Sequence, residues 1–266
     1  MPARREHSAL VIHGSAVVHP SAKIDPSAEV GPNCVIGDAV EIGARTKLLA
    51  HVVVNGRTRI GEDCSIYPFA SIGMPSQDRK AEGEERSFTF IGDRTTIREY
   101  VSIHRASGAE ETTWVGDDCL LLAYVHIAHN CRIGNSVTMS NLAQLAGHCI
   151  VEDHASFGGM TGTHQFVRVG RYSFVGGMTR LARDVPPFLL VEGNPAKAYG
   201  LNSVGLRRAE FPPDVLAELK ECYKIMYHSN RNLSQALVAL KEIVKTDAGR
   251  HLIAFLEGES ARGILK

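Results

Sequence analysis

The chain has 266 residues, of which 44% are hydrophobic, and it carries 29 acidic and 29 basic residues. This balance gives no net positive charge that would attract nucleic acid. The first ten residues include basic side chains but no apolar stretch behind them, and no later run of about twenty apolar residues could cross a bilayer. We therefore expect a cytoplasmic protein with no integral membrane segment and no nucleic-acid partner.

A six-residue period runs through the first 181 residues, with an aliphatic anchor at every sixth position and a small residue four places later. No helix has this period. The pattern is typical of a parallel β-helix in which three hexads make one coil. The anchors, among which only Thr163 is polar, are Ile12, Val18, Ile24, Val30, Ile36, Ile42, Leu48, Val54, Ile60, Ile66 and Ile72, then Ile91, Ile97 and Ile103, then Val115, Leu121, Ile127, Ile133, Met139, Leu145, Val151, Phe157, Thr163, Val169, Val175 and Leu181.

The period is interrupted twice. Residues 73–90, GMPSQDRKAEGEERSFTF, are too highly charged for a core and are predicted to leave the scaffold as a loop. Between His104 and Trp114 the period survives only through Ala109, so this stretch is either a poor hexad or a short excursion.

Five of the six cysteines take the small inward position of the hexad, which indicates buried packing rather than disulfides or metal ligands. They are Cys34, Cys64, Cys119, Cys131 and Cys149.

After Leu181 the hexads end, and apolar residues recur at three- and four-residue spacing. We predict a β-helix domain over residues 1–190 and an α-helical domain over residues 191–266. Its helices are opened by Pro212-Pro213-Asp214, by Ser234 as N-cap, and by Asp247. From Lys197 onward there are eleven Lys plus Arg against eight Asp plus Glu. This weakly basic end suits an acidic partner, although a solvated helical face explains the count equally well.

Residues eighteen apart share a corner of adjacent coils, which collects polar side chains and histidines on one edge of the coil stack. The corner stacks His129, Gly147 and Gln165, and the next column holds Asn130, His148 and Phe166, with His126 and His164 on the flanks. His129 takes a turn position whose side chain points outward. The amide of the glycine on the next coil can approach a reacting carbonyl, so this corner pairs a candidate imidazole base with a candidate oxyanion donor.

Several motifs together resemble one family. They are the hexads, the loop Gln77-Asp78-Arg79-Lys80, the runs His126-Ile127-Ala128-His129, Ala146-Gly147-His148, Gly158-Gly159-Met160 and His164-Gln165-Phe166, and the helical end. Over nearly the full chain they resemble the UDP-N-acetylglucosamine O-acyltransferases that begin lipid A biosynthesis. The resemblance implies a left-handed coil and a homotrimer with active sites between neighbouring prisms. It also implies acyl carrier protein as donor, a UDP-sugar as acceptor and no cofactor beyond the phosphopantetheine that the donor carries.

The same resemblance implies roles for individual residues. His129 would be the general base, Gly147 the oxyanion donor, and Gly177 the position that measures the acyl chain. Asn202 and Arg208 would touch the nucleotide or the phosphopantetheine. The contacts that hold the sugar and the donor would be Gln77, Asp78, Lys80, His126, His148, His164 and Gln165.

Two positions depart from the family pattern. Many members have an acid directly after the catalytic histidine, where this chain has Asn130, so no carboxylate is present there to orient the base or to raise its pKa. Arg208 is followed by Ala209, where further basic character is common. Contacts of the carrier protein or the nucleotide at this point are therefore less well supported.

Other functions fit parts of the sequence. The related N-acyltransferase of the same pathway would have a uridine-binding domain before its hexads, whereas the hexads here begin at Ile12. A zinc hydratase could use His126 and His129 but gives no role to the Gln-Asp-Arg-Lys loop or the helical end. A non-catalytic scaffold is a third reading. The acyl length, its 3-hydroxylation, and the choice between a 3-hydroxyl and a 3-amine acceptor stay open.

Overall fold

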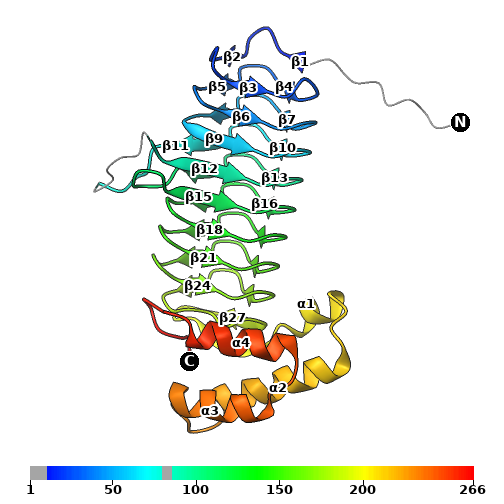
Figure 1. Cartoon of the computed structure of the whole chain (residues 1–266), viewed down its shortest axis with the longest axis vertical. Coiled ribbons are helices and arrows are strands. Elements are labelled where there is room, and N and C mark those ends of the chain that lie inside the picture. Colours follow the sequence, from blue (N-terminus) through cyan, green and yellow to red (C-terminus); the bar gives the residue numbers. More distant parts are fainter. Residues whose placement is uncertain (1–10, 80–85) are drawn as a thin grey trace, which may run out of the picture.

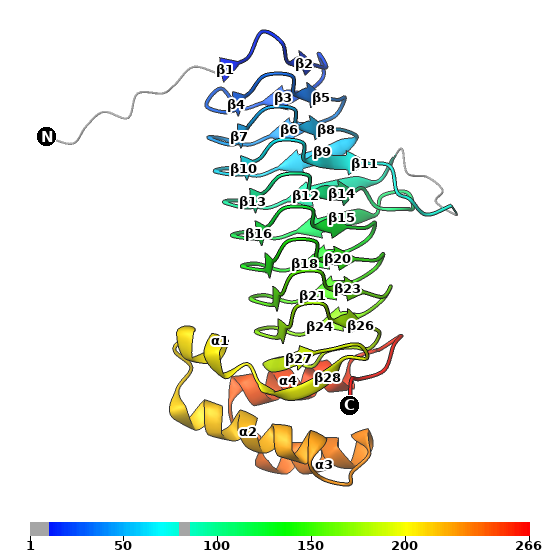
Figure 2. The same cartoon turned by 180° about the vertical axis from the view of Figure 1, so that it is seen from behind.

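A computed structural model of the chain describes residues 11–79 and 86–266. The chain winds into a tall three-sided prism, with the helices packed at the end opposite the N-terminus (Figure 1; Figure 2 shows the reverse side). Each side is one sheet of short strands, which we call sheets A, B and C in the order in which the chain meets them. The strands pair in parallel, except for the last strand of sheet A, which is antiparallel to its neighbour. The prism edges are named after the sheets they join, as the A–B, B–C and C–A edges.

The described residues form sheets of 11, 9 and 8 strands. Sheet A contains β1 (Val11–Ile12), β4 (Glu29–Val30), β7 (Lys47–Leu48), β10 (Ser65–Ile66), β13 (Thr96–Ile97), β16 (Leu120–Leu121), β19 (Thr138–Met139), β22 (Ser156–Phe157), β25 (Phe174–Val175), β27 (Leu189–Glu192) and β28 (Lys197–Leu201). Sheet B contains β2 (Val17–Val18), β5 (Val35–Ile36), β8 (Val53–Val54), β11 (Ser71–Met74), β14 (Ser102–His104), β17 (His126–Ile127), β20 (Gln144–Leu145), β23 (Gly162–Thr163) and β26 (Arg180–Leu181). Sheet C contains β3 (Lys23–Ile24), β6 (Glu41–Ile42), β9 (Arg57–Ile60), β12 (Phe88–Ile91), β15 (Thr112–Val115), β18 (Arg132–Ile133), β21 (Ile150–Val151) and β24 (Arg168–Val169).

The predicted three-hexad coil is confirmed by the strand register. His126 pairs with Gln144, eighteen positions later, and Gln144 pairs in turn with Gly162. The second residue of each two-residue strand is a hexad anchor, and from Val30 onward these anchors are buried, with Ile66 and Ile127 fully so. The cysteines at the small inward position are likewise buried and free. Continuous columns of aliphatic side chains thus fill the prism and account for its six-residue period.

Both interruptions of the period are insertions into the coil. Ser71 pairs with Ser102, thirty-one positions later, because the chain leaves sheet B after β11 and returns at β12. Ser102 pairs with His126, twenty-four positions later, so the second interruption is a short excursion between β14 and β15 and not a poor hexad. Figure 1 shows the described part of the first loop, before residue 80, projecting from the side of the prism.

The helical end consists of α1 (Ser203–Arg208), α2 (Pro213–Tyr227), α3 (Leu233–Ile243) and α4 (Asp247–Glu257). The predicted starts of α2 and α4 are confirmed, but the prediction of Ser234 as an N-cap is wrong. Asn232 caps α3 instead, because its side chain accepts from the amide of Gln235 at 2.9 Å while the Gln235 side chain accepts from the Asn232 amide at 3.1 Å. The sequence pattern also missed α1 and β28, and the predicted division after residue 190 falls within β27.

A buried ion pair joins the helices to the prism. Asp184 is fully buried and accepts from Nε of Arg168 at 2.8 Å. The Arg168 guanidinium lies over the ring of Phe255 in α4, 4.3 Å from its centroid, and donates to the carbonyl of that residue. The position of the helices relative to the last coils is therefore fixed by a charged and hydrogen-bonded contact that would be costly to break.

Candidate active site

A cleft of about 750 Å³ lies on the B–C edge and on the adjoining outer face of sheet B. It brings together most of the residues that the sequence analysis selected, including the near end of the loop after β11. Lys80 lies outside the described residues. The lining residues are Gln77, Asp78, Arg79, His104, His126, Ala128, His129, Gln144, Leu145, Ala146, Gly147, Gly162, Thr163, His164, Gln165, Arg180 and Leu181.

His129 is held by Asn130 in a defined tautomer. Oδ1 of Asn130 accepts from the Ser107 amide at 2.9 Å, and Nδ2 of Asn130 donates to the Ser107 carbonyl at 3.1 Å. Because these backbone groups fix which end of the amide is oxygen, the contact of 2.9 Å between Oδ1 and Nδ1 of His129 requires a proton on Nδ1. Nε2 then carries the free lone pair, so the ring is oriented to accept a proton in the cleft.

Gly147 packs directly on the imidazole of His129. A Cβ built on Gly147 would lie 2.5 Å from both Cε1 and Nε2 of that ring, closer than real side chains approach. A glycine is therefore required here to leave His129 in place, independently of any catalytic role. Among the described residues, no hydrogen bond involves the Gly147 amide, so this N–H is available to a ligand beside Nε2.

His148 and Phe166 continue the edge next to His129. The His148 ring meets His129 edge to face, with centroids 5.1 Å apart, and stacks on Phe166 at 4.7 Å. Partial burial and the nearby His129 lower the pKa of His148, and the carboxylates of Glu111 and Asp78 act in the opposite direction. His148 is thus a mainly neutral ring that supports one face of the site.

His126 is the first residue of β17 and projects from sheet B into the cleft. Its Nδ1 lies 2.8 Å from Oγ of Ser102, and its ring meets His104 edge to face at 4.9 Å. Burial, followed by the charges of His104 and His129, lowers the pKa of His126 to about 4. The side chain is therefore neutral at physiological pH and can hydrogen-bond a sugar hydroxyl without adding charge.

Three predicted residues lie away from the cleft. Gly177 is in the turn between β25 and β26, on the A–B edge. Asn202 is the N-cap of α1, where its amide accepts from Gly205 at 3.1 Å and donates to the carbonyl of Tyr172 on the C–A edge at 2.9 Å. Arg208 is exposed in the last turn of α1. One copy of the chain does not bring these residues to the cleft.

The sequence analysis did not select every residue at the cleft, and His104 and Arg262 are two that it missed. His104 is 7% exposed, and within the described structure its buried Nδ1 has no hydrogen-bond partner. Its position at the end of β14, just before the excursion, was the available signal. Arg262, near the C-terminus, donates from Nε to the carbonyl of Gln165 at 2.7 Å and contacts the ring nitrogens of His164. It is distant in sequence and lies in no motif, so only the fold places it here.

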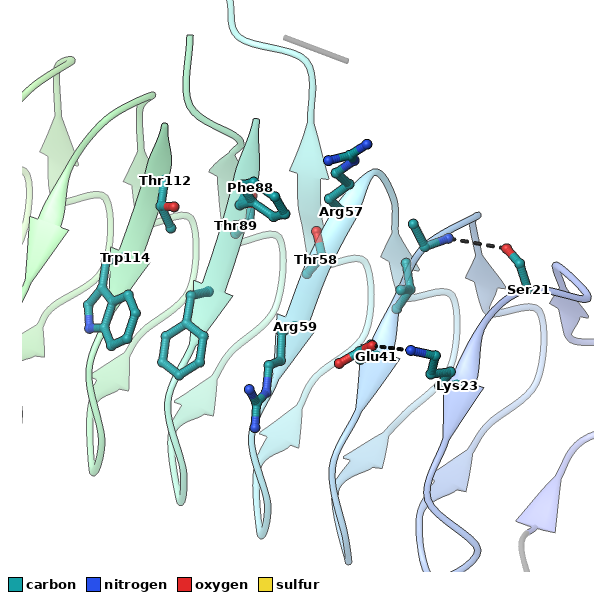
Figure 3. Close-up of a pocket in the computed structure, with 13 residues that line it drawn as sticks. Ser21, Lys23, Glu41, Arg57, Thr58, Arg59, Phe88, Thr89, Thr112 and Trp114 are labelled. Atoms are coloured by element: carbon teal, nitrogen blue, oxygen red, sulfur yellow. Dashed lines mark hydrogen bonds and ion pairs between the residues drawn. The ribbon is translucent and has the colours of Figure 1, made fainter. Parts of the chain in front are cut away.

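A separate cavity of about 640 Å³ lies on the outer face of sheet C (Figure 3). Phe90 and Trp114 stack there with centroids 3.8 Å apart, and Arg59 lies over the Phe90 ring. Lys23 and Glu41 form an ion pair of 2.7 Å at its side, drawn as a dashed line in Figure 3. None of the candidate site residues lines it, so the chemistry is assigned to the histidine cleft.

Two further structural findings concern the described residues only. They contain no group of three or more His, Cys, Asp or Glu side chains placed to hold a metal ion. They also contain no helix that is both long and apolar enough to span a bilayer.

A prism of hexapeptide coils with a histidine cleft on one edge is the architecture of the hexapeptide-repeat acyltransferases. A family model described as UDP N-acetylglucosamine O-acyltransferase, domain 2, matches residues 184–265. A curated relative from Thermodesulfovibrio yellowstonii, an acyl-[acyl-carrier-protein]–UDP-N-acetylglucosamine O-acyltransferase, is 48% identical over 229 residues, which are 85% of this chain and 88% of the relative.

Solved structures agree with this assignment. The UDP-N-acetylglucosamine acyltransferase of Francisella novicida is 38% identical and has a TM-score of 0.92, with 96% of this chain and 94% of that chain covered. The Arabidopsis enzyme is 34% identical, with a TM-score of 0.85 and coverage of 96% and 100%. The chain belongs to the UDP-N-acetylglucosamine O-acyltransferase family. It is an acyltransferase, and its prism is a left-handed parallel β-helix.

Proposed function

We propose that this protein transfers an acyl or 3-hydroxyacyl group from acyl carrier protein to the 3-position of UDP-N-acetylglucosamine, in the first step of lipid A biosynthesis, with His129 as general base. The observation that carries the proposal is the hydrogen bond from Nδ1 of His129 to Asn130, which in the neutral ring leaves the lone pair on Nε2 at the cleft. The relatives named above catalyse this class of transfer according to their names.

In this mechanism Nε2 of His129 takes the proton of the sugar 3-hydroxyl as its oxygen attacks the thioester carbonyl carbon. The amide of Gly147 donates to the oxygen that becomes negative in the tetrahedral intermediate. When the intermediate collapses, the C–S bond breaks and the imidazolium returns the proton to the leaving thiolate of phosphopantetheine. All atoms and charges balance without a cofactor beyond the arm that the donor carries.

Substrate positioning is assigned to the polar residues around the base. Gln77 and Asp78 come from the loop, His126 from sheet B, and His164 and Gln165 from the coil beyond Gly147. Each can hydrogen-bond sugar hydroxyls or the amides of the pantetheine arm. Asn130 stands where many family members have a carboxylate. Its neutral amide orients His129, and no charged partner of the histidine has to lose its water when the substrates bind.

We also propose that the working unit is a homotrimer with each active site between neighbouring prisms. The placement of Gly177, Asn202 and Arg208 away from the cleft supports this, since a neighbouring copy could bring these residues to the cleft. A row of exposed apolar side chains on the A–B edge, where Gly177 lies, offers a surface for such a neighbour. These side chains are Phe69, Tyr100, Tyr124, Leu142, Met160 and Met178.

Product mass spectrometry tests the proposal most directly. The purified protein would be given acyl carrier proteins loaded with defined acyl and 3-hydroxyacyl chains, together with UDP-N-acetylglucosamine or its 3-amino analogue. A product heavier by one acyl group on the acetylglucosamine supports the O-transfer. A product formed only from the amino sugar would identify the acceptor as an amine, and no product from any pairing would overturn the proposal.

A further inference from the structure

The cavity of about 640 Å³ on the outer face of sheet C has no part in the mechanism proposed above. We call it the sheet C cavity. It lies where the strands of this sheet are longest, since β9, β12 and β15 have four residues each and the other strands of the sheet have two. A four-residue strand turns two side chains outward instead of one. Two parallel rows of outward side chains therefore stand on this part of the prism.

Planar side chains dominate both rows. The register gives the first row as Arg57, Phe88 and Thr112, and the second as Lys23, Glu41, Arg59, Phe90 and Trp114. The Arg57 guanidinium lies over the Phe88 ring, 5.4 Å from its centroid. Arg59 lies over Phe90 at 5.9 Å, and the Phe90 ring stacks on Trp114 at 3.8 Å. Figure 3 shows the two rows side by side, each with an arginine on the N-terminal side of its aromatic rings.

The first row continues toward the N-terminus with small side chains. Ala39 and Ser21 occupy the places one and two coils before Arg57, and both line the cavity. Coils repeat at about 4.8 Å, and rings one coil apart stack at this distance on the A–B edge, as Tyr100 and Tyr124 do at 4.8 Å. A planar ring that lies over Ala39 would therefore stack on the Arg57 guanidinium as the next plane of the row.

The sheet C cavity has a net positive charge. Among its described lining residues, Lys23, Arg57 and Arg59 are basic and Glu41 is acidic. Lys23 donates to Glu41 at 2.7 Å. In the part of the chain that the structure describes, the side chains of Arg57 and Arg59 form no hydrogen bond or ion pair. Stacking on aromatic rings leaves the N–H groups at the edge of a guanidinium free, and these groups match the geometry of a phosphate.

We propose that the sheet C cavity binds a nucleoside phosphate, at a site separate from the histidine cleft. The base stacks on the Arg57 guanidinium above Ala39, as bases stack on arginine planes elsewhere. The ribose hydroxyls donate to the Glu41 carboxylate, which is the usual partner of a ribose diol. The phosphate accepts charge-assisted hydrogen bonds from Arg59. This site has no role in acyl transfer.

The dimensions of the cavity suit this ligand. Two residues along a strand lie about 6.6 Å apart and neighbouring coils about 4.8 Å, so the positions of Ala39 and Arg59 are about 8 Å apart on the diagonal. The six bonds from the base nitrogen to the phosphorus of a 5′-nucleotide span about 7.6 Å when extended, at about 3.8 Å per three bonds. The volume of about 640 Å³ lies within the roughly 300–1,000 Å³ of small-molecule sites.

Glu41 and the small side chain of Ala39 discriminate among anions. A fatty acid would bring its carboxylate toward Glu41 without a hydroxyl donor to offer it. Inorganic phosphate would leave the Arg57 plane without a stacking partner, and so would a sugar phosphate. Of these classes, only a nucleoside phosphate combines a planar ring, hydroxyl donors and a negative charge.

The affinity of the full-length protein for free nucleotides tests the proposal. Trp114 is the single tryptophan of the sequence and belongs to the second row, so its fluorescence reports on the cavity. We expect ADP or UDP to change this fluorescence in a saturable way, with a Kd at least about tenfold lower than that of ribose 5-phosphate, which cannot stack. The comparison of ADP with UDP identifies the preferred base. Calorimetry measures the same affinities independently of fluorescence.

Two sets of variants assign the contacts. In the double variant Arg57→Ala/Arg59→Ala, the Kd of the nucleotide should rise at least about tenfold, because the stacking plane and the phosphate donor are both lost. Wild type should bind ADP about fivefold more tightly than 2′-deoxy-ADP, as one hydrogen bond to a carboxylate would give. Glu41→Ala should lose this difference between the two nucleotides.

Arg132→Ala is the matched control, because Arg132 is exposed next to Trp114 on sheet C but does not line the cavity. Its Kd should stay within about twofold of wild type, as for most surface substitutions. Thermal melting should show that all variants are folded. Acyl transfer by the double variant should match that of wild type.

Three results would overturn the proposal. The first is no saturable binding of either nucleotide to wild type, or binding no tighter than that of ribose 5-phosphate. The second is an equal loss of affinity in Arg132→Ala and the double variant, which would indicate diffuse charge attraction. The third is a loss of acyl transfer in the double variant, which would join these arginines to the histidine cleft. Nucleotide binding is measured without an acyl donor, so its outcome does not depend on the function proposed above.

Discussion

The A–B and B–C edges share one turn backbone but carry different chemistry. At the second turn position the chain adopts left-handed φ angles on both edges, 63° at Tyr124 and 58° at Met160 on the A–B edge, and 59° at Asn130 and 61° at His148 on the B–C edge. The first edge is a row of exposed apolar side chains, and the second holds the histidines. The turn backbone therefore does not restrict which side chain points outward, so each edge can acquire its own function.

Hydrogen bonds between stacked coils hold these turns whatever their outward side chains are. A non-glycine residue with positive φ is strained by about 1 kcal/mol or more. Each turn is held by the coil beside it, as where the amide of His148 donates to the carbonyl of His129 at 3.0 Å and that of Met160 donates to Asn141 at 2.9 Å. At Asn130 the amide donates instead to Oγ1 of Thr113 at 2.8 Å. Since none of these bonds uses the side chain of the turn residue itself, that side chain can change without loss of the turn.

The contrast between the edges is tested most severely by removing the base. We expect His129→Ala to lower kcat by at least about three orders of magnitude and to leave UDP-sugar affinity intact, since general base catalysis contributes about 10² to 10⁴ and the oriented ring adds positioning. Steady-state kinetics and calorimetric binding measure the two quantities. His148→Ala, on the same edge, should cost less. Activity of His129→Ala within tenfold of wild type would remove this residue from the role.

The A–B edge is tested by chain-length preference. We expect Gly177→Met to shift preference from long donors of about twelve to fourteen carbons toward shorter ones by two or more orders of magnitude, because excluding four methylenes forfeits about 0.8 kcal/mol each. A Cβ at Gly177 would lie 3.3 Å from the Gly159 carbonyl oxygen, so a side chain fits after a small shift. Competition between donors of different length measures the preference.

Gly14→Met is the control for that experiment, because no atom lies within 4 Å of a Cβ built on Gly14 and the position is far from the cleft in the first coil. It should keep the wild-type order of donors. If Gly177→Met also keeps that order, the measuring position lies elsewhere on the edge, at Met178 or Met160.

A smaller effect is expected from the partner of the base. Asn130→Gly removes the acceptor of the His129 Nδ1–H, and glycine adopts the φ of 59° without strain. Loss of the fixed tautomer should lower kcat by about tenfold to a hundredfold, less than loss of the ring itself. Asn130→Asp keeps the acceptor and should retain more activity than Asn130→Gly. Equal kcat values for the two variants would show that the hydrogen bond does not orient the base.

The smallest effect concerns stability toward acid. His104, His126 and His148 all have lowered pKa values in the folded protein, mainly because of burial. As the pH falls below about 6.5 the unfolded chain binds protons that the folded chain does not, so these groups make folding less favourable, down to about pH 4 for His126. Urea unfolding across this range should give a shallower pH dependence for His126→Gln than for wild type.

His19→Gln is the comparison for this measurement, since His19 is exposed in the first coil. Its stability should follow the wild-type pH dependence. A His126→Gln profile that is parallel to that of wild type would contradict the lowered pKa as a source of acid sensitivity.

Local rules account for what could be predicted of the site. A register of eighteen depends only on the hexad, so the repeat alone is enough to stack His129, Gly147 and Gln165 on one edge. The hydrogen bonds that orient His129 could not be predicted from the period. They depend on Ser107, which holds the Asn130 side chain and lies in an excursion that interrupts the repeat. From the sequence, Asn130 could be interpreted only as a missing carboxylate. In the structure it is the residue that fixes the tautomer of His129.

The prism, its coil length, the inward columns and the column of residues that includes His129 all follow from the amino-acid pattern, because each hexad packs in the same way in every coil. Three features depend instead on how the folded chain is arranged. Gly177 lies on a different edge from His129, Arg262 returns to His164, and Trp114 shares the sheet C cavity with Arg57. The reason is physical: turns, insertions and the docking of the chain end set which distant residues meet, and no local periodicity records those distances.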